Sequence, residues 1–315
     1  MHGNIRDGRP TLADLLDGDG IIVAPGAYDV LSAMIVERTG FSCVYMTGNG
    51  QTSSALGFPD VGMIGLAEMA ERIRATAQQT TVPLIADADV GYGSLLMTQR
   101  AVREFEAAGA AAIQIEDQLS PKKCGHEPGR ILIAAEDMVA RVRAACDARR
   151  SSRTLIVARC DARTTHGLDE ALRRGKLYAD AGADVIFIES PESEEELARV
   201  AREIPVPALA NMVETGRTPY LSGAELERLG FRVAIYPATG FLAATGAVAA
   251  AMAELKETGL AAGSLERMWT LQQYHDFLSF SDYVAREEGF RAVAQAEATA
   301  RATDGTGGDS SGSAG

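Results

Sequence analysis

The sequence predicts an α/β fold of the (β/α)₈ TIM barrel type with extra helices at its carboxyl end. Short apolar or β-branched runs alternate with amphipathic stretches, and eight such runs occur along the chain. Continuous apolar runs that are each followed by a helix are typical of a parallel sheet covered on both faces. Most of the runs end near a polar residue, and a closed barrel would gather these residues around one mouth. An open doubly wound sheet is the alternative, and it would spread them along a crevice.

The predicted elements follow one another regularly along the chain. The strands are expected at 21–24, 43–47, 83–87, 112–116, 155–159, 184–189, 207–211 and 233–237. Between them, apolar residues at three-to-four spacing with charges on the other face predict covering helices. The clearest of these helices are at 66–79, 98–108, 136–149, 168–181, 193–203 and, after the last strand, 241–258.

Four segments are expected along the chain. Residues 1–20 form an N-terminal segment, 21–258 the catalytic barrel, and 259–295 a C-terminal helical extension. Residues 296–315 are rich in Thr, Asp, Gly, Ser and Ala, a composition typical of a disordered tail. The extension carries many aromatic residues for a surface helix, which predicts packing on a partner subunit or on its own barrel. These residues are Trp269, Tyr274, Phe277, Phe280 and Tyr283.

Composition excludes several classes of protein. The formal net charge of −13 argues against a nucleic-acid partner, because such proteins concentrate Lys and Arg on one face. Apolar runs are too short to span a bilayer, so no membrane partner is expected. The four cysteines lie singly, without metal-site spacing, and no charged-then-apolar leader opens the chain, so a cytoplasmic location is expected. A small anionic substrate would need local cations or a metal.

Cys124 is the strongest catalytic candidate. It lies between lysines and a histidine in the polar segment 122–126, with sequence Lys-Lys-Cys-Gly-His. Nearby positive charge lowers the pKa of a thiol and lets it exchange a proton near neutral pH. The alternative is a solvated loop whose thiol merely packs.

Asp87 and Asp89 are candidate metal ligands. They stand one residue apart at the end of a predicted strand, so their side chains point to the same side. Two carboxylates held close together need a cation or a proton, and hard oxygen ligands suit Mg²⁺, with Mn²⁺ as a second choice. Glu116 ends the neighbouring strand and would support the ion through water or as an outer partner. The alternative is a pair of aspartates that cap a helix or bind an arginine.

Other strand ends supply candidate substrate contacts. Arg159 and Glu189 would form either a structural ion pair or a clamp on a substrate carboxylate, since Arg can grip a carboxylate with two hydrogen bonds. Tyr45 precedes a loop of small residues whose backbone N–H groups could approach an anion, although a strand tyrosine also serves for packing. Asn211 is equally ambiguous, and His126 would donate to a substrate oxygen.

The chain resembles the isocitrate lyase and phosphoenolpyruvate mutase superfamily, in particular its methylisocitrate lyase-like branch. The resemblance covers about 24–289, and the Lys-Lys-Cys-Gly-His loop is its most specific part. The motifs that carry it are Gly-Ala-Tyr-Asp at 26–29, Leu-Gly-Phe-Pro-Asp at 56–60, Asp-Ala-Asp-Val-Gly-Tyr-Gly at 87–93, Glu-Asp-Gln at 116–118, Lys-Lys-Cys-Gly-His at 122–126 and Ala-Asn-Met-Val-Glu at 210–214.

The resemblance implies a role for each matching residue. Asp87 and Asp89 would hold Mg²⁺, with Asp60 and Glu116 in the outer shell of ligands. The loop around Cys124 would be a gate that also bears Lys122, Gly125 and His126. The residues that would line the site for a 2-keto or 2-hydroxy acid are Tyr45, Thr47, Gly48, Asn49, Arg159, Glu189, Asn211 and Pro237. The family also implies dimers or tetramers whose last helix is exchanged between subunits.

The implied activity is Mg²⁺-dependent cleavage of a carbon–carbon bond in a 2-hydroxy di- or tricarboxylate, with pyruvate or another 2-keto acid and a carboxylate as products. Tyr45 as phenolate, or a water at the metal, would take the hydroxyl proton, and Cys124 would deliver a proton to carbon. Thr47, Gly48 and Asn49 replace the Ser-Gly-Gly of methylisocitrate lyases, which leaves the identity of the acid open. Cys160 replaces a threonine and is expected to be a packing change.

Three alternatives to the lyase remain at this point. A phosphonomutase that forms a carbon–phosphorus bond, of the carboxyphosphonoenolpyruvate type, is the first, because its relatives can carry the same loop. Decarboxylation or hydrolysis of oxaloacetate is the second, and Cys124 argues against the decarboxylase because simple decarboxylases of the family lack the thiol. A non-enzymatic scaffold would be expected to have lost the aspartate pair or the loop, and both are present.

Overall fold

The computed structural model of the chain describes residues 10–125 and 127–304. Two compact units are distinguished, with the division after Thr245. The first contains all eight strands, and the second contains the C-terminal helices. Each unit is described by itself.

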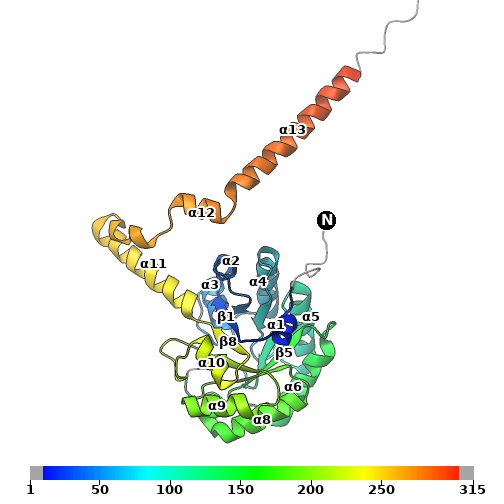
Figure 1. Cartoon of the computed structure of the whole chain (residues 1–315), viewed down its shortest axis with the longest axis vertical. Coiled ribbons are helices and arrows are strands. Elements are labelled where there is room, and N and C mark those ends of the chain that lie inside the picture. Colours follow the sequence, from blue (N-terminus) through cyan, green and yellow to red (C-terminus); the bar gives the residue numbers. More distant parts are fainter. Residues whose placement is uncertain (1–9, 126, 305–315) are drawn as a thin grey trace, which may run out of the picture. The chain divides into compact units, whose positions relative to one another are not determined.

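The first unit is a closed barrel of eight parallel strands in sequential order, as the sequence predicts (Figure 1). Closure is made by β1 and β8, where Ile22 lies opposite Val233 and Pro25 opposite Tyr236. The strands are β1 (Ile22–Ala27), β2 (Val44–Met46), β3 (Leu84–Asp87), β4 (Ala112–Glu116), β5 (Leu155–Cys160), β6 (Val185–Ile188), β7 (Ala208–Asn211) and β8 (Val233–Tyr236).

Helices surround the strands, and Figure 1 shows α2, α4, α5, α6, α8 and α9 around the barrel. Several helices are preceded by a capping residue whose side chain accepts a hydrogen bond from a backbone N–H of the first turn. Examples are Ser94 before α5 and Ser193 before α9. The helices of this unit are α1 (Leu12–Asp17), α2 (Val30–Arg38), α3 (Gly48–Leu56), α4 (Leu66–Gln79), α5 (Leu95–Ala108), α6 (Ala135–Ala148), α7 (Arg163–His166), α8 (Leu168–Asp180), α9 (Glu194–Glu203), α10 (Gly223–Leu229) and the first part of α11 (Thr239–Thr258).

Helix α3 differs from the expectation of a loop after β2. The segment Gly48-Asn49-Gly50 forms the first turn of a helix, with Thr47 as the capping residue. Glycine has a low helix propensity, which is why the sequence pattern did not indicate a helix there. At the start of this turn the Gly48 backbone N–H donates to Asp87 Oδ2 at the end of β3.

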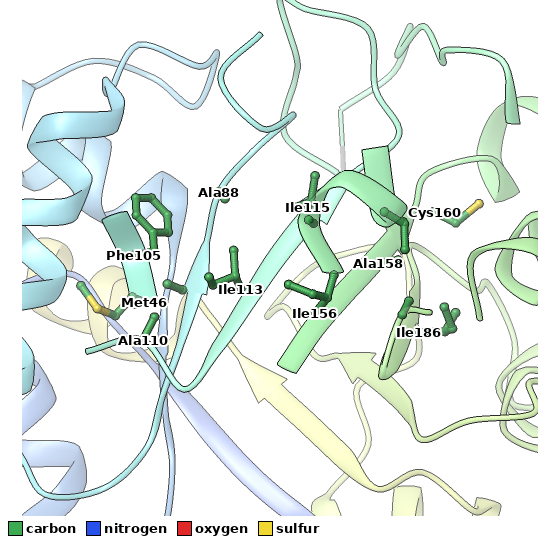
Figure 2. Close-up of a cluster of buried hydrophobic side chains, with 14 of the residues drawn as sticks. Met46, Ala88, Phe105, Ala110, Ile113, Ile115, Ile156, Ala158, Cys160 and Ile186 are labelled. Atoms are coloured by element: carbon green, nitrogen blue, oxygen red, sulfur yellow. The ribbon is translucent and has the colours of Figure 1, made fainter. Parts of the chain in front are cut away.

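The core has two layers that follow the alternation of side chains along each strand. In β5, Leu155 and Val157 point into the barrel interior, whereas Ile156 and Ala158 face the helices. Figure 2 shows the outer layer, in which Phe105 of α5 packs near Met46 and Ile113. The same alternation aims the last residue of several strands into the barrel mouth, because it continues the inward-facing series.

The second unit continues α11 and contains a 3₁₀ turn (Ala262–Arg267), α12 (Leu271–Phe277) and α13 (Phe280–Asp304). Aromatic rings pack within it, with centroids 5.0 Å apart for Trp269 and Phe277. Helix α13 continues past position 296, where the disordered tail is expected to begin, and residues 305–315 lie outside the described part. None of the described helices combines the length and apolar character needed to cross a bilayer.

Candidate active site

A cavity of about 80 Å³ opens at the carboxyl ends of the strands, where the polar residues converge. Side chains from most of the strand ends and from the loop that follows β4 form its walls. The lining residues are Tyr45, Thr47, Asn49, Gly50, Asp60, Asp87, Cys124, Gly125, Arg159, Phe187, Glu189, Asn211, Val213, Ile235, Pro237, Ala238 and Phe241.

Asp87 accepts four hydrogen bonds at the cavity wall. Its Oδ1 accepts hydrogen bonds from the Asp89 backbone N–H at 3.1 Å and from Gln114 Nε2 at 3.2 Å. Its Oδ2 accepts from the Tyr45 hydroxyl and from the Gly48 N–H, both at 3.3 Å. A Cβ at Gly48 would lie 2.7 Å from Oδ2, so only glycine allows this approach. The start of α3 therefore fixes one side of this carboxylate.

Tyr45 is a neutral phenol in this environment. Burial and the nearby Asp87 carboxylate raise the pKa of Tyr45 well above its usual value. Its hydroxyl is also within 3.2 Å of Gln114 Oε1, a second acceptor. A cation bound beside Asp87 would lower this pKa, as Arg159 and Lys122 already do.

Lys122 is a buried cation that joins the loop to the carboxylates. Its Nζ lies 2.8 Å from Asp89 Oδ1 and also forms an ion pair with Asp60. Burial alone would lower the pKa of Lys122, but Asp89 and Asp60 raise it well above its usual value, so the lysine stays charged. Burial, together with Asp87 and Asp60, raises the pKa of Asp89 to about 6, against the opposing effect of Lys122.

The carboxylates fit a divalent cation that keeps other oxygen ligands. Both oxygens of the buried Glu116 accept no hydrogen bond from the described residues, although Arg159 lies nearby, and Asp89 Oδ1 is paired with Lys122 alone. In the described part of the chain, no three His, Cys, Asp or Glu residues form a complete metal cage. Mg²⁺ is usually bound through one or two carboxylates, and substrate oxygens and waters complete its octahedron. Asp87 and Asp89 match that arrangement.

Arg159 is the centre of a buried ion network on the opposite side of the cavity. It binds Asp161 through Nε at 2.9 Å and through Nη2 at 2.8 Å. Its Nη1 lies 3.4 Å from Glu116 and its Nη2 lies 3.3 Å from Glu189. Burial raises the pKa of Glu116 well above its usual value even though Arg159 opposes this. The predicted Arg159–Glu189 pair therefore exists, within a larger network than the sequence indicates.

Asn211 extends this network towards the cavity. Its Nδ2 donates to Glu189 Oε2 at 3.1 Å, while its Oδ1 is buried and has no hydrogen-bond partner among the described residues. A buried acceptor without a donor is costly, so Oδ1 is suited to receive a hydrogen bond from a bound molecule.

The loop after β4 places Cys124 on the cavity wall. Gly125 packs directly against the ion network, because a Cβ there would lie 2.4 Å from Arg159 Nη2 and 2.6 Å from Glu189 Oε2. His126, the other expected residue of the loop, lies outside the described residues.

Most of the residues singled out from the sequence are thus brought together at one end of the barrel. Glu116, Asp89, Gly48 and Lys122 stand just behind the cavity wall and contact residues that line it. Sequence reasoning missed Gln114, whose position on an inward-facing site of β4 was a usable signal. It also missed the apolar walls, because Phe187, Val213 and Phe241 look like ordinary core residues in the sequence.

The fold and the site define a (β/α)₈-barrel enzyme with an acidic, cation-compatible centre at the carboxyl ends of its strands. A family model described as phosphoenolpyruvate phosphomutase matches residues 12–256. The chain belongs to the phosphoenolpyruvate mutase/isocitrate lyase superfamily and is one of its lyase-type enzymes.

Two relatives and one solved structure are especially similar. A 2,3-dimethylmalate lyase of Eubacterium barkeri is 49% identical over 267 residues, covering 85% of this chain and 92% of the relative. A 2-methylisocitrate lyase of Aeropyrum pernix is 43% identical over 276 residues, covering 88% and 89%. A crystal structure of 2,3-dimethylmalate lyase matches with a TM-score of 0.82 at 37% identity, covering 94% of this chain and 96% of that one.

The superfamily also includes proteins with other activities. Among the similar structures are an oxaloacetate acetylhydrolase, with a TM-score of 0.83 at 33% identity, and a phosphonopyruvate hydrolase in complex with oxalate and Mg²⁺, with a TM-score of 0.78 at 29% identity. A carboxyvinyl-carboxyphosphonate phosphorylmutase of Arabidopsis thaliana is 38% identical over 291 residues. The family is therefore established, and the substrate has to be argued from the site.

Proposed function

We propose that the protein is a Mg²⁺-dependent carbon–carbon lyase that cleaves a 2-hydroxy di- or tricarboxylate of the 2,3-dimethylmalate or 2-methylisocitrate type. Its products would be pyruvate, or another 2-keto acid, and a carboxylate. The observation that carries this proposal is the position of Cys124 on the wall of the same cavity as Asp87 and Arg159. A thiol there is placed to give a proton to carbon after the bond breaks. The names of the relatives support the same reaction class.

Asp87 and Asp89 would hold the metal, and Asp60 and Glu116 would support it from further out. Mg²⁺ is the expected ion, and Mn²⁺ could replace it because it accepts the same oxygen ligands. When bound, the ion would polarise the substrate oxygens and offset the negative charge that develops there. Lys122 already supplies one positive charge to Asp60 and Asp89.

The residues around Arg159 would orient the substrate. Arg159 offers its guanidinium edge to a substrate carboxylate, while Asp161 and Glu189 keep it in place. Asn211 Oδ1 would accept a hydrogen bond from the substrate. Thr47 and Asn49, together with the backbone of Gly48, would border the end of the cavity next to Asp87.

Bond cleavage requires two proton transfers. The substrate hydroxyl gives its proton to a base, either Tyr45 in its phenolate form or a water, and its electrons form the carbonyl of the 2-keto acid as the bond between C2 and C3 breaks. The electron pair moves onto the departing fragment and its carboxylate. The Cys124 thiol then gives its proton to that carbon, and the thiolate is reprotonated from solvent. Exclusion of water by the closed loop would prevent competing proton transfer.

The apolar part of the cavity favours a substrate with alkyl groups. Phe187, Val213, Ile235, Pro237 and Phe241 all contribute to the wall. Apolar walls cannot satisfy additional charged groups, so a compact acid with methyl substituents fits them better than one with a third carboxylate beside them.

The substrate can be determined by mass analysis of reactions with Mg²⁺ and a panel of acids. The panel is 2,3-dimethylmalate, 2-methylisocitrate, citramalate, oxaloacetate and phosphonopyruvate. We expect pyruvate to appear with 2,3-dimethylmalate or 2-methylisocitrate, and faster with 2,3-dimethylmalate, which has no third carboxylate to place against the apolar wall. Turnover confined to oxaloacetate would instead identify a hydrolase or decarboxylase, and turnover confined to phosphonopyruvate would identify chemistry at a carbon–phosphorus bond, which also covers the phosphonomutase alternative.

Replacing the thiol tests the proton donor. Cys124→Ser should lower kcat by at least about 100-fold, because a hydroxyl is a much weaker acid than a thiol and general acid catalysis contributes that much. Binding of Mn²⁺ and pyruvate, followed by calorimetry, should be unchanged. The matched control is Cys146→Ser, whose Sγ lies by the carbonyl of Gly182 on the outside of the barrel. Wild-type turnover by Cys124→Ser would refute the role.

Removing one aspartate tests the metal site. Asp87→Ala should abolish both the dependence of activity on Mg²⁺ and the activity itself, with a loss of about 1,000-fold or more, because a bound metal contributes several kcal/mol to catalysis. Electron paramagnetic resonance of Mn²⁺ should show that binding is lost. Asp147→Ala, an exposed change on α6, should leave both properties intact. Unchanged Mn²⁺ binding in Asp87→Ala would place the metal elsewhere.

We also propose that the enzyme works as a homo-oligomer in the cytoplasm, as a dimer or tetramer with the C-terminal helices exchanged between subunits. The support is the number of large apolar side chains exposed within that unit, among them Leu271 and Phe290, which are 70% and 68% exposed. Analytical ultracentrifugation should give a dimer or tetramer, and removal of residues 259–315 should shift it toward smaller species. A monomeric full-length chain would contradict the proposal.

A further inference from the structure

The backbone on either side of Cys124 is held by side chains from the ends of two strands. Gln118 follows β4 and contacts Lys123, the residue before the cysteine. Ser190 follows β6 and contacts Gly125, the residue after it. Neither Gln118 nor Ser190 lines the cavity. We refer to this pair as the Gln118–Ser190 clamp.

The side-chain amide of Gln118 forms two hydrogen bonds with the backbone of Lys123, in the same way as the backbone of a neighbouring strand would. Its Oε1 accepts from the Lys123 N–H at 2.9 Å, and its Nε2 donates to the Lys123 carbonyl oxygen at 2.9 Å. Only Asn and Gln side chains can donate and accept in this way through one amide group. Gln118 is only 1% exposed, and both bonds are partly buried, which limits competition from water. Their loss would remove both hydrogen bonds that the Gln118 amide forms with the Lys123 backbone.

A buried carboxylate fixes the orientation of the Gln118 amide. Its Nε2 also lies 3.3 Å from Asp161 Oδ1, an acceptor that requires the nitrogen to be on that side. Asp161 is bound by Arg159 from the cavity and by Arg130 Nη1, at 2.7 Å, from the far end of the loop. Gln118 is therefore linked through Asp161 to Arg159, the residue that would hold the substrate carboxylate.

Ser190 holds the other side of the cysteine. Its Oγ lies 3.1 Å from the Gly125 carbonyl oxygen and 3.1 Å from Glu189 Oε1, so its one proton is shared between two acceptors. Ser190 has φ +59°, an uncommon conformation for a residue with a side chain. The space beside Gly125 is filled by Arg159 and Glu189, so Gly125 packs closely against both side chains.

We propose that Gln118 and Ser190 are positioning residues that seat Cys124 on the cavity wall. They act through the backbone of Lys123 and Gly125 and do not touch the substrate. The catalytic meaning of this inference rests on the proposed lyase function, but the seating of the thiol does not. Because the clamp consists only of side chains and backbone of this chain, it should restrict access to Cys124 without any added substrate.

Alkylation of the cysteines tests the clamp without any substrate. The rate of reaction with iodoacetamide is followed for each cysteine-containing peptide by mass spectrometry. Gln118→Met removes the donor and the acceptor and keeps the length of the side chain. It should raise the rate at Cys124 by about tenfold or more, since two hydrogen bonds of about 1 kcal/mol each are lost. The rate at Cys146, on the barrel exterior, is the internal reference.

Two further variants make the result decisive. Gln78→Met, an exposed change on α4, should leave the rate at Cys124 unchanged. Ser190→Ala should raise it by a smaller factor, and it decides the question if Gln118→Met does not fold by circular dichroism. In both clamp variants kcat should fall more than KM rises, because the thiol is displaced while the residues that bind the substrate remain.

The outcomes separate the clamp from the proposed function. Faster alkylation of Cys124 in the variants supports the clamp even if the wild type cleaves none of the tested acids. An unchanged rate at Cys124 in folded Gln118→Met or Ser190→Ala overturns it, whatever happens to activity. A uniform rise at Cys124, Cys146 and the buried Cys43 and Cys160 also overturns it, because it would show general loosening of the fold.

Discussion

The barrel mouth depends on balancing buried carboxylates with cations. Parallel strands in register bring acidic residues from adjacent strands into one small region, where burial raises the pKa of Glu116 and Asp89. Arg159 offsets the negative charge of Glu116, and Lys122 offsets that of Asp89. Since removing a partner from a buried ion pair leaves an uncompensated charge, each of these cations is needed for the geometry. A divalent cation at Asp87 and Asp89 would complete the balance.

The balance of carboxylates and cations also fixes the position of the loop after β4. Lys122 and Gly125 belong to the same loop as Cys124, and one is bound to the aspartates while the other packs on Arg159. The thiol is therefore placed by the same interactions that neutralise the carboxylates. Rearrangement of either set of charges would move the loop, which makes the proposed metal site and the proposed proton donor parts of one arrangement.

Local periodicity was sufficient for the barrel and for the polar strand ends, whereas cavity residues such as Asp60 and Thr47 came only from the family resemblance. Side chains alternate along each strand, so the inward direction of Asp87, Arg159 and Glu189 follows from the apolar residues before them. The contacts of Lys122 with Asp60 and of Gln118 with Lys123 could not be predicted, because they depend on how a loop folds back. The helical start at Gly48 was missed since tertiary contact with Asp87 outweighs the low helix propensity of glycine.

The central claim is that the carboxylates at the barrel mouth bind one divalent cation. The most direct measurement is urea unfolding of the ligand-free protein at increasing Mg²⁺, with NaCl at equal ionic strength as reference. The account predicts a saturable rise in the free energy of unfolding that reaches about 2.7 kcal/mol at roughly 100 times the dissociation constant. Identical unfolding curves in Mg²⁺ and NaCl would contradict it.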